Sequence, residues 1–239
     1  MAAEGEFDLI ARFRRTTAAT DRVALGIGDD CAALRFRPGA EVLVTTDMLM
    51  EGRHFLLDGP PLPSIGRKCL GVNLSDIAAM AGRPVAAVVA VALPRGRAVE
   101  IGLGLHAGIE AMAREFDVAL VGGDTNAWDG PLVVSVTVLG EATGRGPVPR
   151  SGARVGDIVF VTGPLGGSLM GRHLDPRPRV REALSLHQSA DLHAMIDLSD
   201  GLASDLGHIL EESGGLGAML DAAAVPIHPD AHVASARDG

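Results

Sequence analysis

Hydrophobic and polar positions along the chain follow two different periods, and their alternation predicts a fold of class α/β or α+β. Short apolar runs rich in β-branched residues predict strands, whereas apolar residues spaced three and four apart predict helices. The expected strands are 42–46, 85–93, 118–121 and 132–139, and the expected helices are 64–81 and 97–116. Because two glycines follow residue 121, we expect the third strand to end there.

The pattern breaks at residues 145–156, where proline, glycine and arginine cluster. This composition is typical of a junction, so we predict a first domain at 1–148 and a second at 149–239. After the junction, the segment DIVFVTG predicts a strand from Asp157, and a helix is expected from Ser168. The segment 195–215 predicts a short strand, an acidic turn and a further helix.

The composition of the chain argues against some classes of function. The chain has 239 residues and a formal net charge of −9, which argues against nucleic-acid binding and fits a protein that collects cations. The N-terminus lacks the features of a signal peptide, and the longest apolar run, 84–93, is too short to span a bilayer. We therefore expect a cytoplasmic protein without a membrane partner. Cys31 and Cys69 are expected to be small buried hydrophobic residues.

Several aspartates are candidates for a site: Asp29, Asp30, Asp47, Asp76, Asp124, Asp197 and Asp200. Four of them are expected where an apolar strand stops, beside glycine, serine or threonine. Each one alone fits a helix cap or a turn, and that reading predicts no effect of magnesium on stability. Several such ends meeting in space would repel one another unless cations joined them. Magnesium takes oxygen ligands and shares them with substrate phosphates, and Thr45 and Thr46 add hydroxyl oxygens.

Phosphate recognition has weaker signals. The chain has no GxxxxGK[ST] segment, so a nucleotide would have to be held by other means. The turns VGGDT and GPLGGS offer backbone N–H groups to phosphate oxygens, although glycines also simply make turns. Arg150, and less favourably Lys68, are the basic candidates, and a solvated linker arginine is the alternative reading of Arg150.

Seven segments, in this order, carry a family resemblance: GEFDLIARF, LGIGDDCAAL, VTTDMLMEGRHF, VNLSDIAAMAG, LVGGDT, PRSGARVGD and IDLSDGLASDLGHI. Together they resemble the thiamine-monophosphate kinase family, within the aminoimidazole-ribonucleotide-synthetase-like superfamily. The resemblance extends from Gly5 to about Pro229. It implies two α/β domains, with the first domains of a homodimer closing a shared barrel and the nucleotide lying in the resulting cleft.

The resemblance also implies roles for individual residues. Positions matching magnesium ligands are Asp30, Thr45, Thr46, Asp47, Asp76, Asp124, Asp197 and Asp200. Positions matching ATP contacts are His106, Gly123, Asp124, Arg150 and Ser199, and His54 matches a substrate contact. At the position of His106 relatives often carry tyrosine.

The implied reaction transfers the γ-phosphoryl group of ATP to the phosphate of thiamine monophosphate, giving thiamine diphosphate with magnesium as cofactor. It needs neither a covalent enzyme intermediate nor a general base. Relatives continue beyond the position of Gly239, so the second domain is expected to be incomplete and turnover poor. Two alternatives remain: a related enzyme that phosphorylates another acceptor, and a fragment that binds nucleotide without catalysis.

Overall fold

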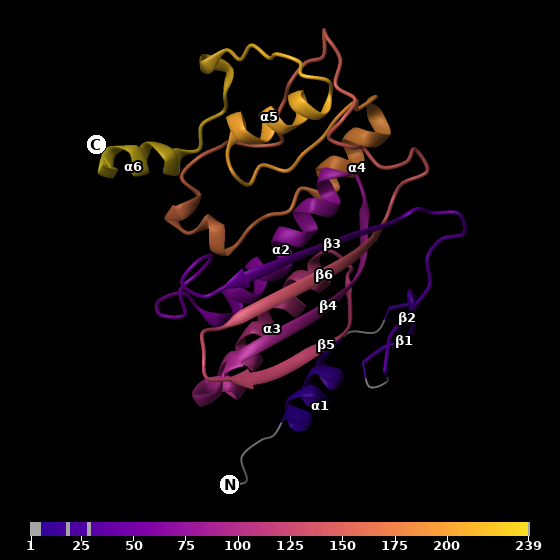
Figure 1. The fold of residues 1–239 in the computed structure, drawn as a ribbon, viewed down its shortest axis with the longest axis vertical. Coiled ribbons are helices and arrows are strands. Elements are labelled where there is room, and N and C mark those ends of the chain that lie inside the picture. The colour runs from indigo at the N-terminus through magenta and orange to yellow at the C-terminus, as the bar shows by residue number, and fades with distance from the viewer. Residues whose placement is uncertain (1–5, 18–19, 28–29, 239) are drawn as a thin grey trace.

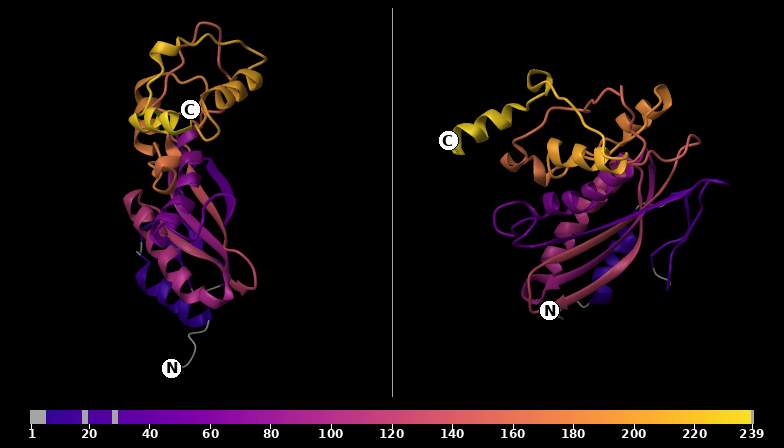
Figure 2. Two further views of the ribbon diagram at one scale, coloured as in Figure 1. Left: turned by 90° about the vertical axis from the view of Figure 1, so that its left-hand side faces the viewer. Right: turned by 45° about the horizontal axis from the view of Figure 1, so that its top comes forward.

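The computed structural model describes residues 6–17, 20–27 and 30–238. One four-stranded sheet lies at its centre, with two long helices on one face (Figure 1). The C-terminal helices gather at the end of the molecule opposite to the first described helix, Glu6–Thr16 (Figure 2). No helix among these residues combines the length and apolar character needed to cross a bilayer.

The sheet has the strand order β3-β6-β4-β5. Its strands are β3 (Val42–Met50), β6 (Val133–Glu141), β4 (Arg83–Pro94) and β5 (Ala119–Trp128). Strand β6 is antiparallel to both of its neighbours, whereas β4 and β5 are parallel. A parallel pair needs a crossover, which the turn η1 (Arg95–Arg97) and helix α3 (Ala98–Glu115) supply. This mixed sheet with helices agrees with the predicted fold class, and within the described ranges it is open and does not close into a barrel.

The core lies between this sheet and helices α2 (Leu62–Ala79) and α3. Alternate residues of β6, namely Val134, Val136 and Val138, are fully buried against the helices. The two helices touch through their backbones, because a Cβ on Gly108 would overlap the carbonyl oxygen of Pro63. Small residues at this crossing therefore bring α2 and α3 closer than ordinary side chains allow.

The four predicted strands and two predicted helices of the first half are confirmed, but two strands extend further than predicted: β3 continues to Met50 instead of ending at 46, and β5 is also longer. Strand β5 continues through Gly122 and Gly123 to Trp128 instead of ending at 121. The pairing of β4 with β5 shifts by one residue at this point, and a Cβ on Gly123 would overlap the carbonyl oxygen of Val89. The glycines thus permit a bulge and a close approach of two backbones, which is their other common role in strands.

The second half is helical and irregular. It contains α4 (Val180–Ser189), α5 (Leu202–Glu212), α6 (Pro229–Asp238) and the short turns η2 (Ser168–Met170), η3 (Arg172–Leu174) and η4 (Ala222–Ala224). The strands predicted from Asp157 and before the acidic turn at 197–200 are wrong, since neither segment pairs with a neighbour in the described part of the chain. Ile158 remains 87% exposed. At Ser168 only a single 3-10 turn forms in place of the expected helix.

The N-terminal segment divides between two sides of the sheet, with its helix beside α3 and its hairpin on the face that α2 and α3 leave open. Helix α1 (Glu6–Thr16) contacts α3, and the small hairpin of β1 (Val23–Leu25) and β2 (Ala33–Leu34) covers one end of that face. Val23 and Leu34 lie there against Val121 and its neighbours. Cys69 is buried as expected, but the prediction for Cys31 is wrong, because it lies on an exposed bend before β2.

A buried carboxylate holds this hairpin to the sheet. Glu141, at the end of β6, is fully buried and accepts hydrogen bonds from Arg22 Nη1 and Arg37 Nε, each at 2.6 Å. The backbone N–H of Arg37 adds a third bond at 2.6 Å. Burial alone would raise the pKa of Glu141, but the bonds from the two arginines outweigh it and hold the pKa below its ordinary value.

We expect Glu141→Gln to lower the free energy of unfolding by about 3 kcal/mol, because it leaves two guanidinium groups beside a neutral partner. The melting temperature should fall by roughly 6–12 °C, measured by calorimetry at pH 7. As pH falls through the lowered pKa of Glu141, the advantage of the native chain should disappear. Glu182→Gln is the matched control, because Glu182 pairs with Arg179 at the surface. Equal small losses in both variants would contradict a stabilising role for the buried carboxylate.

Candidate functional site

The site begins where the C-terminal turn of α2 meets β3. Odd-numbered residues of β3 face the helices, so Thr45 and Asp47 point toward α2. Thr45 Oγ1 donates a hydrogen bond to Asp76 Oδ2 of α2 at 2.5 Å. The C-terminus of a helix carries partial negative charge, which disfavours a carboxylate there. Asp76 therefore occupies a position that favours a neighbouring cation.

The loop before α5 brings a third carboxylate to the same place. Ser75 Oγ, next to Asp76 on α2, donates a hydrogen bond to Asp197 Oδ2 at 3.0 Å. The loop is held there by the backbone bond from Met195 N–H to the carbonyl of Pro149. We call Asp47, Asp76 and Asp197 the acidic cluster, because charge interactions link them in sequence from β3 to α2 to the loop.

Burial and mutual repulsion raise the pKa of all three carboxyl groups. For Asp47 the main cause is burial, followed by the charge of Asp197. For Asp76 and Asp197 burial again comes first, and neighbouring carboxylates of the cluster add to it, while hydrogen bonds from Thr45 and Ser75 act in the opposite direction. The ionised form of each carboxyl group is thus disfavoured relative to that of an exposed aspartate, and a neighbouring positive charge would offset this cost.

Two basic groups flank the cluster. Arg150 follows Pro149, and its charge lowers the pKa of Asp76 and of Asp197. His54 lies just beyond the C-terminal end of β3, near enough to Asp47 for an electrostatic interaction. The His54 ring is oriented by a hydrogen bond from Met50 N–H to Nδ1 at 3.0 Å, which leaves Nε2 as the protonated, donating nitrogen. Lys68 Nζ donates to the carbonyl oxygen of His54 at 2.5 Å and fixes the same turn.

Other predicted metal ligands lie elsewhere. Thr46 points to the open face of the sheet, where its hydroxyl accepts a bond from Thr137 Oγ1 at 2.9 Å. Asp124 lies on β5, the opposite edge strand, roughly 14 Å from β3 by three strand spacings. Its carboxylate accepts a bond from Asn126 Nδ2 at 2.8 Å, and Gly123 precedes it at the bulge. A single chain thus places Thr46 and Asp124 apart from the acidic cluster.

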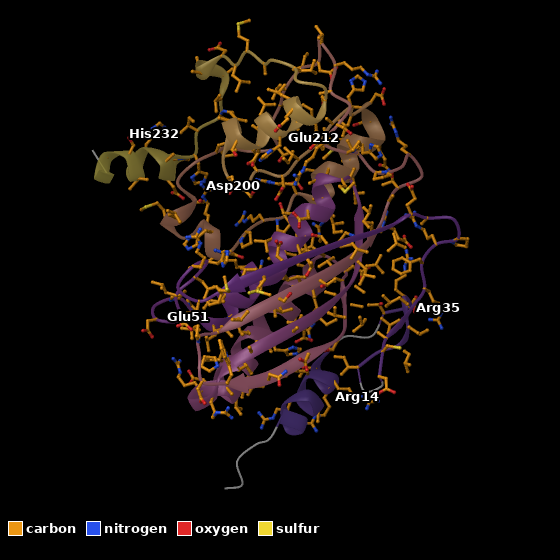
Figure 3. All side chains as sticks on the ribbon, in the orientation of Figure 1. Arg14, Arg35, Glu51, Asp200, Glu212 and His232 are labelled. Carbon is orange, nitrogen blue, oxygen red and sulfur yellow. The ribbon has the colours of Figure 1, made fainter. Side chains whose placement is uncertain are left out.

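The remaining acidic turns are solvent-exposed. Asp30 follows β1 on the N-terminal segment, and its neighbour Asp29 lies outside the described residues. Ser199 and Asp200 are exposed on the loop before α5, in the upper half of the molecule in Figure 3. Sequence reasoning missed Asp205, a buried residue that binds this loop, although its position in the first turn of a helix is a known capping signal.

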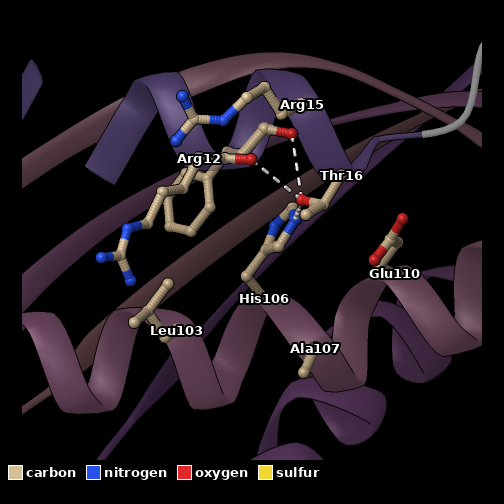
Figure 4. Close-up of a pocket in the computed structure, with 8 residues that line it drawn as sticks. Arg12, Arg15, Thr16, Leu103, His106, Ala107 and Glu110 are labelled. Atoms are coloured by element: carbon tan, nitrogen blue, oxygen red, sulfur yellow. Dashed lines mark hydrogen bonds between the residues drawn. The ribbon is translucent and has the colours of Figure 1, made fainter. Parts of the chain in front are cut away.

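His106 lies on α3 and faces α1 (Figure 4). Its ring stacks on Phe13 with centroids 4.3 Å apart, and Nε2 is 2.9 Å from Thr16 Oγ1. Burial lowers the pKa of His106, which favours the neutral ring at pH 7. These residues line a pocket of about 400 Å³, together with Arg12, Arg15 and Glu110. Figure 4 shows both arginines on α1.

The oxygen atoms of the acidic cluster could bind a hard divalent cation such as magnesium, but they do not surround an ion on all sides. The acidic cluster and the hydroxyls of Thr45 and Ser75 offer only oxygen atoms, which magnesium prefers. Among the residues that the structure describes, no three His, Cys, Asp or Glu side chains converge closely enough to enclose a metal ion. An ion held by one or two carboxylates, with phosphate and water completing its shell, fits this spacing.

Comparison with known proteins gives consistent results. Residues 28–142 match the family model of the AIR synthase related protein, N-terminal domain. The chain is 41% identical over 241 residues to thiamine-monophosphate kinase of Rhodopirellula baltica, covering 98% of this chain and 75% of that protein. The crystal structure of thiamine-monophosphate kinase from Stenotrophomonas maltophilia K279a superposes with a TM-score of 0.83 at 38% identity, over 95% of this chain and 77% of that one.

A further solved structure carries ligands. It is AaThiL complexed with AMPPCP and TMP, with a TM-score of 0.69 at 32% identity, over 88% of this chain and 71% of that chain. That protein binds both ligands in one structure.

We expect Asp47→Asn to stabilise the protein at pH 7 when divalent cations are absent. The pKa of Asp47 is raised, so the folded chain loses stability as pH rises above the ordinary value of 3.8, and a neutral amide escapes this loss. The melting temperature should rise by roughly 2–4 °C per kcal/mol of relieved repulsion, and the difference should shrink toward pH 4.

Calorimetry between pH 4 and 7, with and without magnesium, measures this effect. Magnesium should stabilise the native chain more than the variant. Asp129→Asn is the control, because Asp129 is exposed and pairs with Arg95. A variant that is less stable than the native chain at pH 7 without cations would contradict repulsion within the acidic cluster.

Proposed function

The chain belongs to the thiamine-monophosphate kinase family, and from this premise we propose that it transfers the γ-phosphoryl group of ATP to the phosphate of thiamine monophosphate. The match to a relative that binds AMPPCP and TMP together is the observation that carries the proposal. AMPPCP is an ATP analogue, so one relative holds both reactants at once. The acidic cluster adds a site of suitable chemistry in this chain.

In the proposed reaction an oxygen of the acceptor phosphate forms a bond to the γ-phosphorus while the bond from that phosphorus to the leaving ADP breaks. The acceptor oxygen is ionised near neutral pH, so no residue has to remove a proton. Magnesium, held by Asp47, Asp76 and Asp197, would neutralise the anionic phosphates and help to align them. The protein contributes mainly positioning and electrostatic complementarity.

Side chains near the acidic cluster would position the carboxylates and bind the two substrates. Thr45 and Ser75 orient the carboxylates of Asp76 and Asp197 through the hydrogen bonds described above. Arg150, beside two of these carboxylates, would bind a phosphate of ATP with its guanidinium group. His54 Nε2 is available to donate to the acceptor, because Nδ1 is occupied by Met50 N–H.

Other family-matched positions complete the proposal. Asp30, Thr46, Asp124 and Asp200 would serve as further magnesium ligands, and His106, Gly123 and Ser199 as ATP contacts. We place the activity in the cytoplasm.

The open face of the sheet, which carries Thr46 and Asp124, also has the character of an interface for a homodimer. The open face of the sheet carries exposed apolar side chains on its edge strand β3, with Val44 at 65% and Met48 at 58% exposure. Val42 and Met50 extend this surface along β3, and Trp128 is exposed on β5, the opposite edge strand. Exposed apolar side chains gathered along one strand are typical of protein–protein interfaces. We propose that a second copy covers it, which brings the edge strands of two chains together.

Asp47→Ala should lower kcat/KM for thiamine diphosphate formation by roughly 100-fold or more, because it removes a group that binds the shared cation. The assay measures thiamine diphosphate at saturating magnesium, and repeats it without magnesium. Asp129→Ala, at an exposed position, should leave the rate unchanged. Near-normal turnover by Asp47→Ala would refute the proposed role, and an unphosphorylated acceptor in the native reaction would refute the proposed activity.

Val44→Asp should weaken self-association, with a dissociation constant higher by roughly 30-fold, because a symmetric interface carries each substitution twice. Sedimentation velocity over a range of concentrations measures this constant. Val155→Asp is the matched control, since Val155 is 92% exposed in the second half of the chain. Equal association of both variants and the native chain would show that the open face is not the interface.

A further inference from the structure

The loop that carries Ser199 and Asp200 wraps around one buried carboxylate. Asp205 Oδ2 accepts hydrogen bonds from the backbone N–H groups of Ser199 at 3.0 Å, Asp200 at 3.2 Å and Gly201 at 3.1 Å. Asp205 is 2% exposed, and its own N–H donates to the carbonyl of Gly201 at 3.0 Å. A single oxygen therefore organises three consecutive residues of this loop.

This arrangement limits how the loop can bind a ligand. Its three consecutive N–H groups would otherwise suit a phosphate, as they do in many nucleotide-binding loops. Because Asp205 already accepts them, the contacts left to this turn come from its carbonyl oxygens and from the side chains of Ser199 and Asp200. Both residues are exposed, and they lie two and three positions after Asp197 of the acidic cluster.

We infer that Asp205 is a positioning residue for magnesium–nucleotide binding, which fixes the turn that presents Ser199 and Asp200 without touching the ligand itself. The inference rests on the proposed function. Its carboxylate fills the space that a bound phosphate would take in a loop with free N–H groups, so the turn is set before the ligand arrives. Preorganisation of this kind lowers the entropic cost of binding.

An ordinary helix cap elsewhere in the chain provides the contrast. Asp221 caps the turn η4 by accepting one hydrogen bond from Ala223 N–H at 2.9 Å, and it is exposed. A cap of this type affects stability alone. Asp205 differs in its burial, in its three partners and in its electrostatic interaction with Asp197. If Asp205 were only a cap, its loss would change stability and leave nucleotide affinity unaltered.

The experiment measures the dissociation constant of AMPPCP in the presence of magnesium by isothermal titration calorimetry, well below the melting temperature. Asp205→Ala should raise this constant roughly 10-fold or more, as is typical when a supporting residue behind a binding group is lost. Asp205→Asn keeps one acceptor oxygen and loses the charge, so its effect should be intermediate. Asp221→Ala, which also loses a cap, should bind like the native chain.

Each outcome bears on a separate claim. If the native chain binds magnesium–AMPPCP and both Asp205 variants bind within 2-fold of it, on the order of experimental error in such constants, the inference is wrong and the proposed function stands. If the native chain binds no nucleotide, both are wrong. Should Asp205→Ala fail to fold, Asp205→Asn decides alone, with its fold checked by circular dichroism. In the assay of thiamine diphosphate formation, Asp205→Ala and Asp205→Asn should each raise KM for ATP more than they lower kcat.

Discussion

Three carboxylates lie within electrostatic reach of one another where α2 meets β3, and the repulsion between them opposes the packing that holds them there. The hydroxyls of Thr45 and Ser75 hold two of them in place, and packing of α2 against the sheet prevents them from moving apart. That packing depends in turn on the glycine contacts between α2 and α3, which fix the depth at which α2 lies. The free energy of the core thus maintains an arrangement of charges that would not assemble by itself.

A buried carboxylate also lies in the same sheet, but its negative charge is neutralised by partners within the chain. Glu141 is more deeply buried than any member of the acidic cluster, yet two arginines and a backbone N–H satisfy it. The pKa of Glu141 is lowered, whereas the pKa values of Asp47, Asp76 and Asp197 are raised. A lowered pKa is expected for a carboxylate that stabilises the fold, such as Glu141. Raised pKa values are expected for carboxylates that bind a partner from outside the chain, as we propose for the three aspartates.

The sequence allowed the first half of the fold to be predicted, because each strand and helix there has a clear period. The second half was predicted poorly. DIVFVTG has the composition of a strand, but a strand also needs a neighbour to accept its hydrogen bonds, and local sequence does not show one. Among the candidate site residues, the sequence marked the members of the cluster as acidic turns, but Asp47 lies within β3, Asp76 lies on α2 and no strand precedes Asp197, so their grouping depended on tertiary structure. The placement of Asp124 on the opposite edge strand and of His106 against α1 could not be read from spacing along the chain.

Adjacent residues of strand β3 lie in different chemical environments, because they face opposite sides of the sheet. Thr45 faces α2 and the acidic cluster, while Thr46 faces the open side of the sheet. The side-chain period of a strand is two residues, so an insertion or deletion of one residue in β3 would exchange these faces for every position beyond it. Changes in length within this strand are therefore restricted to even numbers. The loss or gain of a single codon in the gene segment that encodes β3 should therefore be more damaging than most substitutions in it.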